Sequence, residues 1–254
     1  MRTTDVKANR LFIVLAGFFL TNALIAEFVG VKIFSLEATL GVAPYEWSLL
    51  GVSGNLNFTA GVLLWPFVFV MTDVINEYFG ERGVRLISWV AVVFIAYAFL
   101  AAYASISLAP AGFWVEANRN LGVADIQGAY AQIFGQGLWT IAGSIVAFLV
   151  GQLVDVVVFH RIRRVTGDDH VWLRATGSTA VSQILDSFVV LYIAFVLGPQ
   201  KWSMSQFLAV GTVNYIYKMG AAFAMIPLLY VARHLIKSYL GADETARLKA
   251  QAAE

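Results

Sequence analysis

Seven ionisable side chains lie within long apolar runs of this sequence, where a charge is costly. They are five acids and two bases: Glu27, Lys32, Asp73, Glu77, Asp155, Asp186 and Lys218. A charged side chain at the centre of a bilayer costs about 2.5–3.5 kcal/mol on insertion scales, so such groups face the interior of a helix bundle or water. We therefore expect an acidic internal cavity, in which some carboxyl groups are protonated or meet a cationic ligand.

The densest group of these residues falls in the second apolar run. Asp73, Asn76 and Glu77 stand at positions i, i+3 and i+4, so they share one face of a helix. Capping of the helix end near Gly80 explains them poorly, because carboxylates oppose the dipole at a helix C-terminus. For Glu77, and for Asn22 in the first run, a structural role and a functional role stay equally open.

The motif Gln-x-x-Asp occurs twice, as Gln152 with Asp155 and as Gln183 with Asp186. The two segments would cross the membrane in opposite directions, so the repetition is consistent with a local inverted repeat of the kind that builds transporter binding sites. Polar side chains also hold transmembrane helices together, at about 0.6 kcal/mol each on average. For Asp155, Asp186 and the base Lys218, their depth in the apolar runs favours a functional cavity.

The last apolar run carries Asn214 and Lys218 as i, i+4 neighbours, with two tyrosines between them. We expect Lys218 to pair with one of the acids when the cavity holds no ligand. Pro227 is expected to kink this last helix, because proline removes a backbone hydrogen bond.

The overall composition indicates a membrane protein. Apolar residues make up 59% of the chain and charged residues 13%, against about 45–50% and about 25% in soluble domains. The net charge of +1 gives no sign of nucleic-acid binding, and the absence of cysteine excludes disulfides and thiol chemistry. No Walker-type phosphate loop and no His-x-x-x-His pair is present, so we expect neither an enzyme nor a cofactor.

Six apolar segments are long enough to cross a bilayer, whose core of about 30 Å needs about 20 helical residues. Each is expected to be a helix, because lipid offers no partner to bare backbone groups. The predicted spans are 11–35, 58–80, 84–109, 138–164, 175–198 and 206–236. The prediction is thus an all-α integral membrane protein, with one transmembrane domain at 1–237 and a cytoplasmic tail at 238–254 that is a short solvated helix or disordered.

The distribution of Lys and Arg predicts the orientation. Thirteen of these cations lie in the two tails and in the loops on the same side, whereas only Arg119 and Lys201 lie in the opposite loops. Because positive charge is enriched in cytoplasmic loops, both termini are expected in the cytoplasm of a bacterial inner membrane. On the outer side, residues 36–57 are expected to form a hairpin, and 110–137 either an interfacial or re-entrant helix or an exposed loop with aromatic anchors.

The sequence resembles a known family at several of these residues. The segment 66–80, PFVFVMTDVINEYFG, is similar to the Thr-Asp-x-x-x-Glu-x-(Tyr/Phe)-Gly signature of the queuosine precursor transporter family, also described as vitamin uptake transporters. The Ser-Gln-x-x-Asp segment at 182–186, and Lys218 followed by Pro227, resemble further landmarks of that family. The resemblance extends over 11–236 in the order of the spans.

The resemblance implies import of 7-deazaguanine precursors of the tRNA nucleoside queuosine, the nitrile and aminomethyl forms preQ0 and preQ1. It also implies a fold like that of the substrate-binding subunits of energy-coupling-factor importers. A guanine edge suits carboxylates and amides, which accept and donate the paired hydrogen bonds it needs. A planar ring would stack on an aromatic side chain, although Trp65, Trp89 and Trp139 are expected to face lipid or the core. The predicted substrate site comprises Asp73, Asn76, Glu77, Gln152, Asp155, Gln183, Asp186, Asn214 and Lys218.

Two other hypotheses stay open. The chain could be the substrate-binding module of an ATP-driven vitamin or nucleobase importer, docked on a separate ATPase through small residues such as Ala16 and Gly17. It could also be a membrane enzyme, although no motif supports that. The expected partners are the deazapurine and the lipid bilayer, without nucleic acid, and the sequence leaves a homo-oligomer open. It does not specify the coupling ion or which deazapurine is preferred.

Overall fold

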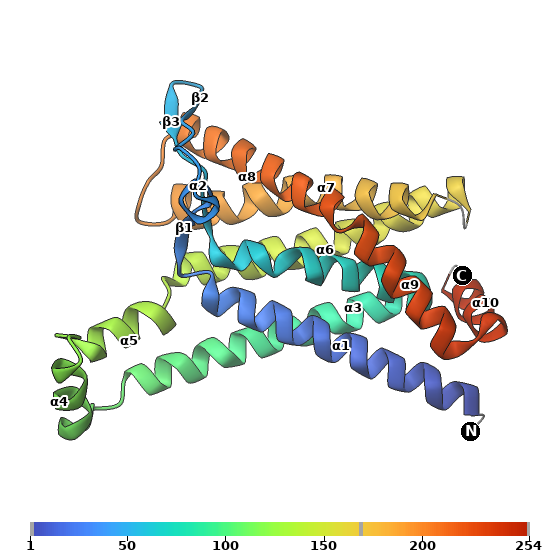
Figure 1. The fold of residues 1–254 in the computed structure, drawn as a ribbon, viewed down its shortest axis with the longest axis horizontal. Helices are drawn as coiled ribbons and strands as arrows, with labels where there is room; N and C mark the ends of the chain where they lie inside the picture. Colours follow the sequence, from blue (N-terminus) through green and yellow to red (C-terminus); the bar gives the residue numbers. More distant parts are fainter. Residues whose placement is uncertain (1–2, 168–169, 253–254) are drawn as a thin grey trace.

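Long helices dominate the computed structural model, which describes residues 3–167 and 170–252 (Figure 1). The long helices are α1 Thr3–Val29, α3 Trp65–Ile106, α6 Leu138–Thr166, α7 Val171–Leu191, α8 Met204–Ala224 and α9 Ile226–Leu240. A π-helical turn, η2 Tyr192–Leu197, extends α7. The predicted all-helical membrane architecture is confirmed to this extent: within the described ranges, five helices are long and apolar enough to cross a membrane.

Five such helices were found where the sequence predicts six spans, because the predicted spans 58–80 and 84–109 are joined in the single 42-residue helix α3. Gly80 interrupts this helix with φ 67° and ψ −172°, a conformation almost restricted to glycine. Figure 1 shows the chain changing direction at this point, so that the second half of α3 runs back along the bundle. A topology of six crossings stays a prediction.

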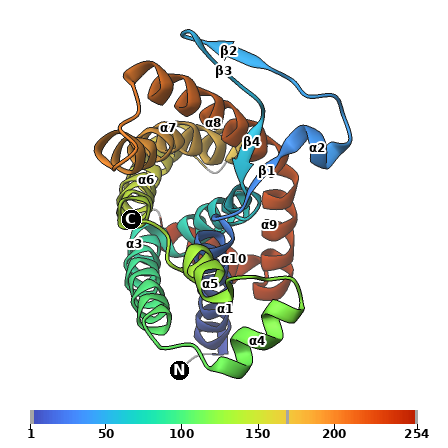
Figure 2. The ribbon, with the colours of Figure 1, turned by 90° about the vertical axis from the view of Figure 1, so that its left-hand side faces the viewer.

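The first half of α3 lies at the centre of the bundle. Every residue from Thr72 to Tyr78 is buried, so both faces of this segment are covered by other helices. Figure 2 looks along the bundle and shows α1, α6, α7, α8, α9 and the second half of α3 around this central segment. The polar residues of the second apolar run are therefore enclosed by protein, and do not face lipid.

One end of the bundle carries the short strands. They are β1 Ile33–Ser35, β2 Trp47–Leu49, β3 Val52–Gly54 and β4 Asn57–Thr59, with α2 Leu36–Leu40 and the 3-10 turn η1 Ala60–Leu63. β1 pairs with β4 and β2 pairs with β3, both antiparallel. The expected hairpin is present as β2–β3. The first predicted span is too long, because α1 ends at Val29 and the chain is extended by Ile33; the second begins at Trp65 instead of 58.

The ends of the other helices agree more closely with the spans predicted from the sequence. The predicted kink at Pro227 is confirmed, because α8 ends at Ala224 and α9 begins at Ile226 with the proline in its first turn. The connection 110–137 forms two short helices, α4 Gly112–Asn120 and α5 Ile126–Phe134, at the strand end of the bundle (Figure 1).

The first turns of α1 and the tail lie at the end of the bundle opposite the strands (Figure 1). There the tail forms the helix α10 Ala242–Gln251, which is not solvated on all sides, since Glu244, Thr245 and Leu248 are buried. The backbone of Ala252 lies against the bend of α3, where a Cβ placed on Gly80 would be 3.1 Å from the carbonyl oxygen of Ala252. Of the two forms expected for the tail, the structure thus shows a short helix, which packs against the bundle on one face.

Candidate functional site

Two neighbouring cavities inside the bundle share Val62, Trp65 and Lys218 in their linings. The larger one, with a volume of about 440 Å³, lies below the strands and is called here the strand-side cavity. Its polar side chains include Glu27, Asn57, Gln136, Ser144, Asp186, Asn214 and Lys218. The volume falls within the range of about 300–1,000 Å³ that is usual for small-molecule sites.

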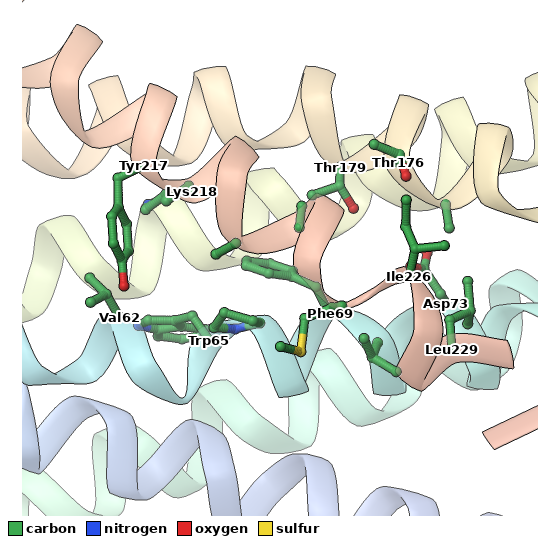
Figure 3. Close-up of a pocket in the computed structure, with 16 residues that line it drawn as sticks. Val62, Trp65, Phe69, Asp73, Thr176, Thr179, Tyr217, Lys218, Ile226 and Leu229 are labelled. Atoms are coloured by element: carbon green, nitrogen blue, oxygen red, sulfur yellow. The ribbon is translucent and has the colours of Figure 1, made fainter. Parts of the chain in front are cut away.

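The smaller cavity lies further towards the termini and is called here the central cavity (Figure 3). Figure 3 shows Tyr217 and Lys218 at one end of it and Asp73, Ile226 and Leu229 at the other, with Trp65 and Phe69 along one side. Its volume is about 30 Å³, enough for only one or two water molecules. The strand-side cavity thus has room for a small molecule, whereas the central cavity does not.

Lys218 and Asp186 form an ion pair between α8 and α7 at the strand-side cavity. Their side chains are 18% and 21% exposed, so the pair can be reached from the cavity. Asn214, one helical turn before Lys218, lines the same cavity. The structure thus brings three of the predicted site residues together and gives Lys218 the acidic partner expected for it.

Glu27 on α1 faces these residues across the cavity, and the list of predicted site residues omitted it. Ser144 Oγ on α6 donates a hydrogen bond of 2.5 Å to Glu27 Oε1, and Gln136 Nε2 donates one of 2.7 Å to the Glu27 backbone oxygen. The side chain is almost fully buried. Its position within an apolar run is the sequence signal that could have placed it in the site.

Aromatic side chains supply flat surfaces to the strand-side cavity. Phe58 on β4 stacks on Tyr217 of α8, with ring centroids 4.1 Å apart, and Phe195 stacks on Trp202 at 4.4 Å. Trp65 packs against the hydrophobic core, as expected, and also lines both cavities. Trp89 and Trp139, in contrast, are about half exposed on the outside of the bundle.

The two Gln-x-x-Asp motifs meet face to face between α6 and α7. Ser182, which precedes Gln183, donates a hydrogen bond of 3.1 Å to Asp155 Oδ1. Symmetrically, Gly151 precedes Gln152, and a Cβ placed on it would be 3.6 Å from the Asp186 Cβ. Each aspartate thus lies beside the residue before the glutamine of the other motif, and the inverted repeat stays a prediction.

Four predicted residues form a buried polar layer next to the cavities. Gln152, Asp155 and Gln183 are each at most 3% exposed and lie outside the linings of both cavities. Thr72 Oγ1 donates a hydrogen bond of 3.1 Å to Gln152 Oε1. Among the residues that the structure describes, Gln183 Oε1 and Asp73 Oδ1 have no hydrogen-bond partner. Asp73 alone of the four lines the central cavity.

Asn76 and Glu77 lie beyond this layer, towards the end of the bundle opposite the strands. Glu77 contacts three cations from three other helices: Arg174 on α7 at 3.1 Å, Arg233 on α9 at 2.8 Å, and Lys249 on α10. Asn76 Oδ1 is 2.8 Å from His160 Nε2. We call Glu77, Arg174, Arg233 and Lys249 the Glu77 ion-pair cluster; it closes this end of the bundle and lines neither cavity.

The fold and the cavities define a helical membrane protein with a polar chamber beside its central helix. Residues 59–232 match the family described as "Putative vitamin uptake transporter", and the chain belongs to this family, whose relatives are named queuosine precursor transporters. All nine predicted site residues lie within the matched range. The relatives are named as transporters, which agrees with the absence of enzyme motifs from the sequence.

Three relatives are similar over most of their length. The chain is 30% identical to a probable queuosine precursor transporter of Bacillus subtilis (strain 168), over 72% of this chain and 74% of that protein. It is 28% identical to the Haemophilus influenzae protein of the same name, over 69% and 71%, and 29% identical to the queuosine precursor transporter of Escherichia coli K12, over 63% and 66%. No solved structure matches the chain. The expected likeness to energy-coupling-factor subunits stays a prediction.

Proposed function

We propose that this protein imports 7-deazaguanine precursors of queuosine into bacteria, and that the strand-side cavity is the substrate site. The observation that carries the proposal is the combination, in one chamber of about 440 Å³, of two carboxyl groups, several amides, an ammonium group and aromatic rings. The names of the three relatives support the same substrate class.

The chemistry of the ligand accounts for each of these groups. The N1–H and 2-amino groups of a deazaguanine are adjacent donors, which a carboxyl group such as that of Glu27 accepts in pairs. The ring carbonyl accepts from the amide of Asn214 or the ammonium of Lys218. The flat bicyclic ring stacks against Trp65 or Phe58.

The aminomethyl form adds a cation, for which Asp186 is the natural partner. In the present structure Lys218 forms an ion pair with that carboxylate. Binding of the aminomethyl group would therefore replace the Lys218–Asp186 pair by a pair between the substrate and Asp186. The nitrile form carries no charge and would leave the Lys218–Asp186 pair in place. The pair thus offers a physical basis for distinguishing the two precursors.

The direction of transport follows from the predicted orientation. With both termini in the cytoplasm, the strand-side cavity lies towards the outside, and the narrow central cavity and the Glu77 ion-pair cluster lie between it and the cytoplasm. Import then requires the central cavity to widen after the substrate has bound. In this topology α3 crosses the membrane twice, with its bend at Gly80 on the cytoplasmic side.

The test is uptake in a strain that cannot synthesise queuosine precursors. With this protein supplied on a plasmid, feeding preQ0 or preQ1 is expected to restore queuosine in tRNA, measured by mass spectrometry of nucleosides. Glu27→Gln and Asn214→Ala should reduce this at equal amounts of membrane protein, and Arg119→Gln on exposed α4 is the control. Full salvage by both site variants would overturn the assignment of the cavity. Uptake by the purified protein alone in liposomes distinguishes a transporter from a module of an ATP-driven importer.

A further inference from the structure

A third cavity, which is strongly basic, lies at the end of the bundle opposite the strands. It has a volume of about 810 Å³ and is enclosed by the bend of α3, the last turns of α6, and α10. Its charged lining consists of Arg82, Arg85, Arg163, Arg164 and Lys249 against the single acid Glu81, with His160 beside them. We call it the basic pocket; it shares no residue with the two cavities described above.

Part of this positive charge has no acidic partner among the residues that the structure describes. Glu81 pairs with Arg85 one helical turn away, and Lys249 pairs with Glu77. Arg82 and Arg164 are exposed and form no ion pair within 3–167 and 170–252, the residues that the structure describes. Two guanidinium groups from different helices thus border one polar cavity, without an acidic partner in the described part of the chain. This arrangement favours an anion with several acceptor oxygens, such as a phosphate group.

An exposed apolar stripe begins directly at the basic pocket. Along the second half of α3, one side chain in every three or four is more than half exposed: Leu86, Trp89, Val93, Tyr97 and Leu100. Arg82 and Arg85 are the first positions of the same helix face, because residues three and four apart lie above one another. A cationic end followed by a long apolar face on a membrane helix matches the two parts of a phospholipid.

We propose that the basic pocket binds the headgroup of an anionic phospholipid, with the acyl chains along the stripe Leu86 to Leu100 of α3. Basic pockets at the cytoplasmic ends of membrane helices bind such headgroups, and polybasic segments attract anionic lipid surfaces. The stripe favours a lipid over a free phosphate compound, which would use the pocket alone. Because Lys249 of α10 is one wall of the pocket, the bound headgroup would also hold α10 against the bend of α3.

The test compares lipids on the purified full-length chain in a neutral detergent. Phosphatidylglycerol is expected to raise the melting temperature by several degrees more than phosphatidylcholine, and native mass spectrometry should show it retained preferentially. The double variant Arg82→Gln/Arg164→Gln should lose at least half of both effects. The matched control removes the same charge at the other end of the bundle, with Arg119→Gln/Lys201→Gln, and should keep them. The substituted side chains are all exposed, so the variants are expected to fold.

Four results would overturn the proposal. These are equal effects of the two lipids, an unchanged lipid effect in Arg82→Gln/Arg164→Gln, or an equal loss in the control variant, which would indicate attraction by net charge alone. The fourth is full stabilisation by glycerol 3-phosphate, because a free phosphate compound would then be the ligand. None of these results depends on uptake, so the proposal stands or fails separately from the transport function.

Discussion

Lys218 on α8 pairs with Asp186 on α7 at the place where the strand-side and central cavities meet. The pair joins the second Gln-x-x-Asp motif to the last apolar helix and is partly accessible from the larger cavity. Removing one partner of such a partly buried pair is costly, because the other charge remains without compensation. Under the proposed function, the aminomethyl cation of the substrate replaces Lys218 as the partner of Asp186.

The first prediction follows from that exchange. Asp186→Asn leaves Lys218 as an uncompensated cation in the cavity, so uptake of the cationic preQ1 should fall by tenfold or more, corresponding to about 1.4 kcal/mol. Uptake of the neutral preQ0 should fall less. The measurement is tRNA queuosine after feeding each precursor. The double variant Asp186→Asn/Lys218→Met removes both charges, so the losses of preQ1 uptake and of preQ0 uptake should become more similar. An equal loss for both precursors would indicate a purely structural pair.

The second prediction concerns the Glu77 ion-pair cluster. Glu77→Gln leaves three cations close together around a neutral side chain that is 1% exposed, at an expected cost of about 3–5 kcal/mol in stability. Glu81→Gln is the matched control, because its pair with Arg85 is exposed and worth only about 0.3–0.5 kcal/mol. Thermal unfolding in detergent is the measurement. Similar melting temperatures for the two variants would mean that the cluster does not hold this end together.

The third prediction tests the bend of α3. Gly80→Ala places a Cβ about 3.1 Å from the backbone oxygen of Ala252 and forces alanine into a conformation that costs about 1–3 kcal/mol. Gly220→Ala on α8 is the control, because a Cβ there meets nothing within 4 Å and alanine favours the helix. We expect a lower melting temperature for the first variant and an unchanged or higher one for the second.

The fourth prediction concerns pH and the strand end. The backbone N–H of Leu56 donates a hydrogen bond of 2.8 Å to Glu37 Oε1, which lowers the pKa of this carboxyl group. A lowered folded pKa stabilises the fold above the unfolded pKa, about 4.3, and this stability is lost as the pH falls through the folded pKa. Protease resistance of 30–64 should therefore decrease on acidification in the wild type. In Glu37→Gln it should be lower already at neutral pH and independent of pH.

Much of the site could be predicted because burying polar groups in lipid is expensive. The seven ionisable groups in apolar runs include Glu27, Asp73, Asp186 and Lys218, all of which line a cavity. The repetition of the Gln-x-x-Asp motif was visible in the sequence, whereas the pairing of Ser182 with Asp155 was not. The family resemblance, read from the segment 66–80, is confirmed by the match over 59–232.

Other features depend on contacts between distant residues, which hydropathy does not encode. The strand β4 falls within a segment apolar enough to be counted as the start of a span, yet it pairs with β1. The polar sequence of α10 gives no sign that this helix packs against the bundle. The reason lies in the structure, where Lys249 of α10 forms an ion pair with Glu77. The bend of α3 at Gly80 likewise packs against Ala252, a residue far away in the sequence.

The Glu77 ion-pair cluster has a consequence for how the chain is made. Glu77 is translated early, and its partner Arg233 follows 156 residues later, with Lys249 later still. Until those residues emerge, the carboxylate has only Arg174 to balance it, and contacts of such large sequence separation form slowly. The Glu77 ion-pair cluster can therefore form completely only after α9 and α10 have been synthesised. A chain that stalls on the ribosome before Arg233 lacks these ion pairs, so this end of its bundle is not held together by them.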